Sequence, residues 1–284
     1  MKGEKMSNKK ENIKREMKET FNKIAKSFGE VGPKYWDEFG NRLVKLSNIK
    51  EGAEVLDVGM GRGASLFPAI KKVGENGKVI GIDISENMVK ETYKEISIKS
   101  IENAKVLVMD VDKLEFNNQS FDNIIGGFVF GYFLFSENRF DEILRVLKKG
   151  GQVGFSMWGN QEDQKWLNKL IKRYIPVNKK SENKEKSTIP DFSTVEGVKK
   201  ILNNSGFKNI KVYKEENKVI YKDKNEWWQE MWSNAARNTL EKIDNLGRSE
   251  IEEFKKEVFN ELEEFRCEQG FCFTMPVIYA LGTK

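Results

Sequence analysis

The sequence of 284 residues contains no histidine at all. This absence excludes Ser-His-Asp and Cys-His nucleophile systems, and it excludes zinc or iron sites that use imidazole ligands. It also removes the side chain that most often acts as a general base near neutral pH. An enzyme with this sequence must therefore work without the usual proton shuttle, and we expect no metal site.

Cysteine is nearly absent as well, with only Cys267 and Cys272 near the C-terminus. Two cysteines five positions apart make neither a disulfide framework nor a metal site, so we expect two free thiols in a reducing compartment. The first 18 residues are charged throughout and lack the apolar core of a secretory signal. The longest apolar stretch, Ile124 to Phe135, is shorter than the ~18 to 20 residues that span a bilayer. We therefore expect a cytoplasmic protein without a membrane partner.

The sequence also lacks a large excess of one charge sign, because 49 basic residues nearly balance 44 acidic residues and leave a net charge of +5. The basic residues are mostly lysine and are spread along the whole chain. Nucleic-acid binding favours clustered basic residues, among which arginine contacts phosphates in a bidentate manner. The composition thus argues against a nucleic-acid partner.

What the sequence does contain, from Glu54 to Trp158, is a regular alternation of short apolar segments and amphipathic segments. Strands are predicted at 54–58, 78–83, 105–109, 121–128 and 152–158, with helices at 66–73, 85–99 and 138–147 between them. Strands separated by helices of this length are typical of βαβ units and a parallel sheet.

The flanking regions show other patterns. Two amphipathic helices are predicted before the sheet, over Ile13–Phe28 and from Tyr35 to about Leu46, and residues 1–12 are expected to be disordered. After Trp158 we predict helices at 161–174, 194–205, 225–243 and 249–268, a mobile polar loop at 176–190, and strands at 208–214 and 271–281.

A glycine-rich turn follows the first strand, in the segment Asp57-Val58-Gly59-Met60-Gly61-Arg62-Gly63. Alternate glycines let the backbone approach a ligand closely and bring the next helix N-terminus onto it. The turn alone is weak evidence, because Gly59-x-Gly61-x-x-Ala64 also satisfies the dinucleotide-binding fingerprint. A strand-to-helix turn without a ligand is a further alternative.

Three acids, each at the end of a strand, distinguish these alternatives. Asp57 ends the first strand, where it can face an ammonium group that a pyrophosphate site would not favour. Asp83 ends the second strand and can accept hydrogen bonds from two ribose hydroxyls, as in proteins that bind NAD. Asp110 ends the third strand and can accept a hydrogen bond from an exocyclic adenine amine. Carboxyl ends of parallel strands form the ligand-binding edge of open α/β folds, so the ordered set predicts a nucleoside site.

These residues, together with Phe121-Asp122-Asn123-Ile124-Ile125 and Leu147-Lys148-Lys149-Gly150-Gly151, resemble the successive motifs of class I S-adenosylmethionine-dependent methyltransferases. The resemblance is greatest to the small-molecule group that includes the ubiquinone- and menaquinone-biosynthesis type. It covers about Tyr35 to Trp158 and the closing strand near 271–281.

The resemblance implies an α/β fold: a Rossmann-like, doubly wound, mostly parallel seven-stranded sheet with an antiparallel last strand, N-terminal helices and a helical lid insertion. Residues 13–284 would form one domain. Its parts would be N-terminal helices at 13–50, a cofactor-binding core at 51–158, a lid or acceptor region at 159–268 and a closing strand at 269–284.

The resemblance also implies a cofactor, S-adenosyl-L-methionine, and residues that bind it. Asp57 and the backbone of Gly59 and Gly61 would hold the methionine moiety, and Asp83 the ribose hydroxyls. The remaining implied contacts are Ile84 and Met88 beside the ribose and adenine, Asp110 and Val111 at the adenine, and Gly126, Gly127 and Phe128 at the sulfonium and acceptor. Arg62 is large for its position and either reaches the substrate or is solvated.

Methyl transfer from a sulfonium is compatible with a chain that lacks histidine, because the donor is already activated and alignment is the main requirement. An amine, a carbon nucleophile or a readily ionised phenol can attack without a strong base, so we favour these acceptors over an aliphatic alcohol. No catalytic base is assigned.

The acceptor pocket is expected to be aromatic and apolar, although core packing is the favoured explanation for most of its candidate residues. Nearest the acceptor we expect Phe128, Tyr132 and Trp158, with Tyr35 and Trp36 folding over the cofactor. Further candidates are Phe130, Phe133, Phe135, Met157, Trp227, Trp228, Met231 and Trp232. Glu226, Glu230, Asn234 and Arg237 are candidate polar contacts, with exposed helix charges as the favoured explanation.

Several other functions compete with a small-molecule methyltransferase that acts as a monomer or homodimer. An RNA or protein methyltransferase on the same fold would need a basic groove, and no Asn-Pro-Pro-Tyr-like tetrad follows the fourth strand. A nicotinamide-dependent oxidoreductase is disfavoured by Asp57, by Asp110 and by the lack of a Tyr-x-x-x-Lys pair. A non-catalytic cofactor-binding module is also compatible with the sequence.

Overall fold

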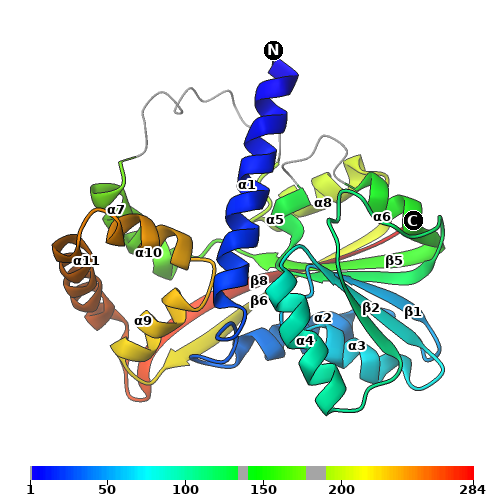
Figure 1. Ribbon diagram of the computed structural model, residues 1–284, viewed down its shortest axis with the longest axis horizontal. Coiled ribbons are helices and arrows are strands. Elements are labelled where there is room, and N and C mark those ends of the chain that lie inside the picture. The colour runs from blue at the N-terminus through cyan, green and yellow to red at the C-terminus, as the bar shows by residue number, and fades with distance from the viewer. Residues whose placement is uncertain (1, 134–139, 177–189) are drawn as a thin grey trace.

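A single twisted sheet organises the protein, whose computed structural model describes residues 2–133, 140–176 and 190–284 (Figure 1). Its strands are β1 Glu54–Val58, β2 Lys78–Asp83, β3 Ala104–Val108, β4 Phe121–Gly127, β5 Leu147–Trp158, β6 Lys208–Tyr221, β7 Arg266–Cys267 and β8 Gly270–Thr283. Seven of them follow the order β3-β2-β1-β4-β5-β8-β6, and the two-residue β7 pairs with β8. Neighbours from β3 to β5 are parallel, whereas β8 is antiparallel to both β5 and β6. The predicted mostly parallel sheet with an antiparallel last strand is confirmed.

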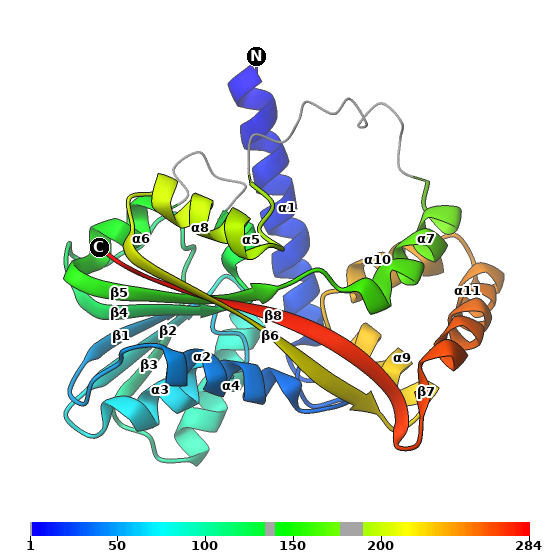
Figure 2. The same cartoon turned by 180° about the vertical axis from the view of Figure 1, so that it is seen from behind.

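Helices cover both faces of this sheet and form a separate group beyond one end of it. They are α1 Lys2–Ile24, α2 Tyr35–Leu46, α3 Leu66–Val73, α4 Glu86–Ile98, α5 Phe130–Phe133, α6 Asp141–Val146, α7 Lys165–Tyr174, α8 Val195–Asn204, α9 Lys224–Trp232, α10 Arg237–Asp244 and α11 Arg248–Glu261. Figure 2 shows α2, α3 and α4 on one face and α5, α6 and α8 on the other. The apolar strands β1 and β4 are thereby buried on both sides, as expected for the centre of a doubly wound sheet.

The long strands β6 and β8 extend beyond the parallel strands of the sheet toward the helices α7, α9, α10 and α11 (Figure 2). We predicted that β6 would end at Lys214, but it continues to Tyr221 because residues 215–221 pair with 271–277 of β8. The helix predicted over 225–243 is divided into α9 and α10. Asn234 Oδ1 accepts a hydrogen bond from the Ala236 amide, a local turn that competes with helix. Helix α11 ends seven residues early because the chain turns to form β7.

The N-terminal helix differs most from expectation. Residues 1–12 were predicted to be disordered, yet α1 begins at Lys2 and stands across the molecule from the sheet edge outward (Figure 1). Its first part is rich in lysine and glutamate, which favour helix and extend the amphipathic segment that follows. Its end is anchored by a small apolar cluster in which Ile24 and Ala25 pack against Met88 of α4.

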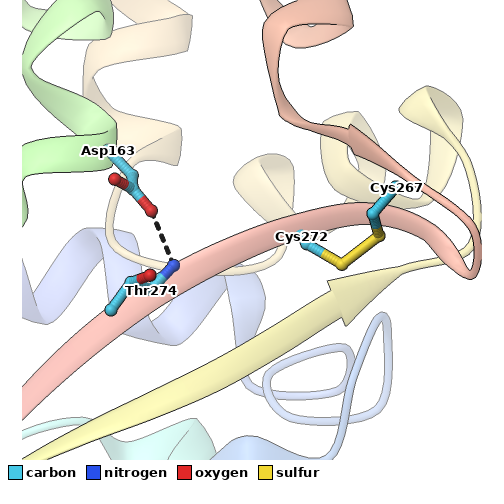
Figure 3. Close-up of a disulfide and its surroundings, with 4 residues drawn as sticks. All are labelled: Asp163, Cys267, Cys272 and Thr274. Carbon is cyan, nitrogen blue, oxygen red and sulfur yellow. Dashed lines mark hydrogen bonds between the residues drawn. A yellow bond between two sulfur atoms is a disulfide. The ribbon is translucent and has the colours of Figure 1, made fainter.

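The two cysteines are bonded to each other, so the expectation of free thiols is wrong. Cys267 lies on β7 and Cys272 on β8, two strands that form a tight hairpin (Figure 3). Hairpin pairing brings their Cα atoms to 6.0 Å, a separation that a disulfide can bridge. The sequence spacing did not reveal this because the hairpin itself was not predicted. Since disulfides are rare in the cytosol, the cytoplasmic location stays a prediction. Across the described residues, no helix combines the length and apolarity that crossing a membrane requires.

The disulfide should be detectable directly by mass. Under non-reducing denaturation we expect iodoacetamide to label neither cysteine, and after reduction to label both. Reduction should lower the free energy of unfolding by no more than about 2 kcal/mol, because the bond closes a short loop. The Cys267→Ser/Cys272→Ser double variant should match the reduced protein in urea unfolding. Full labelling without reductant would restore the original expectation of free thiols.

Candidate functional site

A cavity of about 480 Å³ runs along the carboxyl ends of the parallel strands. Its walls come from the ends of β1, β2, β3, β4 and β5, with α1 and the helices beyond β6 and β8 closing over them. The lining from the strand ends comprises Gly59, Met60, Gly61, Arg62, Ile82, Asp83, Ile84, Met109, Asp110, Val111, Asp112, Gly127, Phe128, Val129 and Trp158. This is the edge at which open α/β sheets bind ligands.

The glycine turn lies at the floor of this cavity in a conformation that favours glycine. Gly59, Gly61 and Gly63 have φ angles of 64°, 52° and 87°. A Cβ atom on Gly59 would lie 2.8 Å from Val129 Cγ2, and one on Gly63 would lie 2.7 Å from the Phe67 ring. The backbone at Gly59 and Gly61 therefore reaches the cavity without a side chain in between.

Asp83 lines the cavity beside this turn. Its Oδ2 accepts a hydrogen bond from the Gly61 amide at 3.0 Å, and its Oδ1 accepts one from the Ser85 amide at 2.8 Å. Burial raises the pKa of Asp83 even though backbone hydrogen bonds from Ser85, Gly61 and Ile84 lower it. Each carboxylate oxygen retains a lone pair, so Asp83 can accept two hydroxyl hydrogen bonds from a ligand.

Asp57 lies beneath the cavity rather than in its wall. It is completely buried, and its Oδ2 accepts a hydrogen bond from Ser65 Oγ at 2.8 Å, while Ser65 itself contributes to the lining. Within the described chain, Asp57 Oδ1 has no hydrogen-bond partner. Burial raises the pKa of Asp57 to about 7; the Ser65 hydrogen bond lowers it and the charge of Asp83 raises it. A buried carboxylate in this state favours a cationic ligand group nearby.

Asp110 lines the far end of the cavity and is already paired with α1. Lys14 Nζ donates to Asp110 Oδ2 at 2.5 Å and also contacts Asp112. Burial lowers the pKa of Lys14, but hydrogen bonds to Asp110 and Asp112 raise it further, so the net shift is upward. Sequence reasoning did not identify Lys14, although the amphipathic pattern of α1 indicated which face would be buried.

Helix α1 closes the cavity through several further contacts. Asn22 Oδ1 accepts hydrogen bonds from Ser85 Oγ and the Asn87 amide, and Lys18 pairs with Glu86. Arg62 was expected to reach the substrate or to be solvated. Arg62 lines the cavity, and its Nη1 donates to the Ala25 carbonyl at 2.8 Å, which holds the end of α1 against the glycine turn. The apolar side chains that α1 adds to the lining are Ile13, Met17 and Phe21.

Two of the remaining residues predicted to contact the cofactor do not line the cavity. Ile84 and Val111 line the cavity, whereas Met88 is fully buried against α1 and Gly126 does not reach the lining. A Cβ atom on Gly126 would lie 2.6 Å from Val129 Cγ1, so this glycine allows β4 and the next turn to approach closely. A role for Met88 and Gly126 in direct contact is therefore disfavoured by their position.

Aromatic side chains gather at the other end of the cavity. The Phe128 and Trp158 rings lie 4.3 Å apart between centroids, and Trp36 packs edge-on at 5.2 Å from Phe128. Tyr35 lies 4.9 Å from Trp36, and Tyr132 completes the aromatic lining. Phe128 has a φ of 56°, an uncommon backbone conformation for a bulky residue that often marks a functional site.

The other aromatic candidates form cores and not the cavity wall. Phe130, Phe133 and Met157 pack in the core on the α5 face, and Trp227 and Trp228 pack in the core of the outer helix group, with Trp232 partly buried beside them. Only Met231 of that α9 set lines the cavity. Phe135 lies outside the described residues.

The polar candidates on α9 and at the start of α10 lie in different environments, and the sequence did not predict this difference. Glu226 accepts a hydrogen bond from the Lys222 amide, just before the Asp223 cap of α9, and Arg237 pairs with Glu241. Glu230, expected to be an exposed helix charge, is 2% exposed and accepts hydrogen bonds from Tyr35, Tyr221 and Asn234. That expectation is wrong because Tyr35 of α2, Tyr221 of β6 and the loop at Gly32 cover this face of α9. Asn234 itself lines the cavity.

No group of three or more potential metal ligands occurs among the residues that the structure describes. The electrostatic character of the cavity comes instead from acids at the β1, β2 and β3 ends and from aromatic faces at the β4 and β5 ends. This arrangement can hold a nucleoside with a cationic substituent at one end and an apolar molecule at the other.

A comparison with known protein families finds a match that spans more than half of the chain. Residues 49–217 match a family model described as a methyltransferase domain. The matched segment begins just before β1 and ends within β6, so it includes the glycine turn and the three acids.

Individual proteins that resemble this chain share about a third of its residues or fewer over the aligned segments. Aklanonic acid methyltransferase DauC of a Streptomyces species is 33% identical over 50% of this chain, and the match spans 65% of that relative's length. A demethylmenaquinone methyltransferase of Staphylococcus saprophyticus is 29% identical over 60% of this chain and 77% of its own. Among solved structures, the YcgJ protein of Bacillus subtilis superposes with a TM-score of 0.56 at 17% identity, covering 87% of this chain and 98% of that one. This last similarity concerns the fold alone.

Proposed function

Because the chain belongs to the family of methyltransferase domains, we propose that it transfers a methyl group from S-adenosylmethionine to a small acceptor molecule. The observation that carries this proposal is the row of Asp57, Asp83 and Asp110 at the ends of β1, β2 and β3, beside one cavity. A nicotinamide dinucleotide would need only the second of these acids.

The residues present suit S-adenosylmethionine. The unpartnered Asp57 Oδ1 would gain a charge-assisted hydrogen bond if the ammonium group of the methionine moiety lay above it. Asp83 offers two lone pairs to the ribose hydroxyls, and Asp110 with the Val111 backbone lies where the adenine would bind. The glycine turn leaves space for the amino-acid part between these groups.

The bound cofactor would supply an activated methyl group on a sulfonium, and the protein would supply alignment. The faces of Phe128 and Trp158 stabilise positive charge through their ring quadrupoles. Helix α1 and the aromatic residues exclude water from the reacting end, which keeps the sulfonium from side reactions. Removing water and fixing the two reactants in line accounts for most of the acceleration that such a transfer requires.

The acceptor end indicates a small apolar or aromatic molecule. It is lined by Phe128, Trp158, Leu167, Met231 and Met275, with Gln161, Gln164 and Asn234 as its few polar groups. Small-molecule pockets have this mixture of mostly apolar wall and a few orienting polar groups. We propose a nitrogen, carbon or readily ionised oxygen nucleophile as the methyl acceptor. We further propose a cytoplasmic enzyme that acts as a monomer or homodimer without a nucleic-acid or membrane partner.

Isothermal titration calorimetry with S-adenosylmethionine and NADH in parallel tests the cofactor. We expect S-adenosylmethionine and its demethylated product to bind, and NADH not to bind. NADH binding in the absence of S-adenosylmethionine binding would replace the proposal with a nicotinamide-dependent oxidoreductase. Salt-dependent binding of RNA by the cofactor-loaded protein would instead favour an RNA acceptor.

A further inference from the structure

The carboxylate of Glu230 is buried at the acceptor end of the cavity and accepts three hydrogen bonds. Tyr35 Oη donates to its Oε1 at 2.6 Å, Asn234 Nδ2 donates to the same oxygen at 3.0 Å, and Tyr221 Oη donates to Oε2 at 3.0 Å. No ion pair with Glu230 occurs in the described part of the chain, which leaves the carboxylate without a compensating cation. Burying a carboxylate without a cationic partner costs stability that hydrogen bonds offset only in part, so its presence indicates a role beyond the fold.

The surroundings of Glu230 isolate it from bulk solvent on one side and connect it to the cavity on the other. A Cβ atom on Gly32 would lie 2.9 Å from Glu230 Cγ, so the loop between α1 and α2 covers the side chain closely. Tyr35 and Asn234 both line the cavity, whereas Tyr221 is fully buried and does not. Of these two lining residues that donate to Glu230, Tyr35 carries a hydroxyl that can both accept and release a proton, whereas Asn234 carries an amide nitrogen that only donates.

We propose that Tyr35 and Glu230 form a proton relay that deprotonates a phenolic or enolic hydroxyl of the acceptor. This inference rests on the proposed methyl transfer and narrows its acceptor to an oxygen nucleophile that must lose a proton. It also revises the view that this chain, lacking histidine, has no base for such an acceptor.

The proton moves in two steps, from the acceptor to Tyr35 and from Tyr35 to Glu230. The acceptor O–H donates to Tyr35 Oη and transfers its proton there as the oxygen attacks the methyl carbon and the carbon–sulfur bond breaks. Tyr35 passes its own proton along the 2.6 Å hydrogen bond to Glu230 Oε1. The products are a methyl ether, a neutral thioether and a protonated Glu230, which is regenerated when the proton leaves after product release. Asn234 Nδ2 keeps Oε1 in place throughout.

The electrostatics of the cluster suit a proton acceptor. Burial raises the pKa of Glu230, and the hydrogen bonds from Tyr35, Asn234 and Tyr221 only partly offset the shift. Burial also raises the pKa of Tyr35, with the Glu230 charge acting in the same direction, so its phenol stays protonated as a relay requires. The titratable groups that face Glu230 are Tyr35 from α2 and Tyr221 from β6.

Two tyrosines on one carboxylate provide a matched pair of variants. Tyr35→Phe and Tyr221→Phe each remove one hydroxyl that donates to Glu230, but only Tyr35 lines the cavity. The probe acceptors are 4-methylphenol, which is protonated at weakly alkaline pH, and 4-nitrophenol, which is largely ionised there. Methyl transfer to each is followed with radiolabelled S-adenosylmethionine, and cofactor binding to every variant is measured by calorimetry.

For 4-methylphenol we expect Tyr35→Phe to lower kcat by at least about 100-fold, the range of general-base catalysis. Tyr221→Phe removes a donor from Glu230 but leaves the Tyr35 path intact, so it should lower kcat by no more than about tenfold. For 4-nitrophenol, which needs no base, the two variants should differ little. Glu230→Gln should remove the acidic limb of the pH–rate profile that Glu230 produces in the wild type, where activity rises as the carboxylate ionises.

Several outcomes would overturn the relay. Equal losses in Tyr35→Phe and Tyr221→Phe would indicate a purely structural cluster, and equal losses for both phenols in Tyr35→Phe would indicate positioning without proton transfer. Wild-type transfer to anilines but to neither phenol, or to no probe despite cofactor binding, would also overturn it. Absence of S-adenosylmethionine binding by the wild type would instead refute the proposed function itself.

Discussion

Replacing Asp83 with alanine should weaken the binding of S-adenosylmethionine by at least about 100-fold, because two charge-assisted hydrogen bonds of roughly 1.5 kcal/mol or more each would be lost. Asp83 is placed for this role at the end of β2, with both oxygens held by the Gly61 and Ser85 amides. Those same amides hold the glycine turn against the start of α4, so the substitution also loosens the turn.

Calorimetry measures the effect, and two controls separate charge from structure. Asp83→Asn keeps the shape and one acceptor oxygen but lacks the charge, so its affinity should fall between those of the wild type and the alanine variant. Glu102→Ala removes an exposed acid that precedes β3 and should leave affinity within about twofold. Unchanged affinity in Asp83→Ala, with the protein still folded by circular dichroism, would show that the ribose lies elsewhere.

The central sheet could be predicted because its signals are local. Each short apolar segment, its glycine or acid at the end and the amphipathic segment that follows lie within about thirty residues of one another, as in β1 with α3 or β2 with α4. The Ser85 cap, predicted from its position, accepts a hydrogen bond from the Met88 amide. The acids at the three strand ends could be placed at one edge for the same reason.

The acceptor end could not be predicted because it depends on distant contacts. Tyr35 and Glu230 are 195 positions apart, and neither the helix pattern of α2 nor that of α9 indicates that their side chains meet. A glutamate among tryptophans on an amphipathic helix has the pattern of a solvent-facing charge. The Cys267–Cys272 bond was missed similarly, because a hairpin with a two-residue strand has little periodicity to detect.

The position of α1 over the cavity could be predicted in part. The apolar spacing of its residues indicated a buried face, but the partner of the polar face was not apparent. Lys14 binds Asp110, a residue that was placed correctly at the end of the third strand. Pairing the two would have required knowing that the helix crosses the sheet edge, which is a property of the tertiary fold.

The ionisation of Asp57 should couple the stability of the protein and its affinity for the cofactor to pH, in opposite directions. Burial raises the pKa of Asp57 from 3.8 to about 7, so the folded state binds a proton more tightly than the unfolded state does. Because folding raises the pKa of Asp57, its contribution to the stability of the protein is greatest below pH 3.8. That contribution is lost as the pH rises toward 7. A shift of about three pKa units corresponds to roughly 4 kcal/mol, an order-of-magnitude value for a buried group.

Asp57→Asn isolates this effect because the amide is neutral at every pH. Urea unfolding between pH 4 and pH 8 should show the variant gaining stability relative to the wild type as the pH rises, by up to about 4 kcal/mol. Asp122→Asn is the matched control, and its stability difference from the wild type should stay nearly constant over this range. The Glu54 amide and Lys148 lower the pKa of Asp122 from 3.8 despite partial burial, so its wild-type contribution is lost only at pH values below this window. A stability difference for Asp57→Asn that does not vary with pH would contradict the assignment.

Cofactor affinity should change in the opposite sense, since the ionised carboxylate is the form that accepts the ammonium group. Wild-type affinity for S-adenosylmethionine should rise as the pH increases through about 7, with uptake of cofactor accompanied by release of a proton from Asp57. Calorimetry in buffers of different ionisation enthalpy measures that proton directly. In Asp57→Asn both the proton release and most of the affinity should be lost, although the unliganded variant is the more stable protein above pH 7. Such a gain in stability with loss of binding is expected where a buried charge is retained for its ligand and not for the fold.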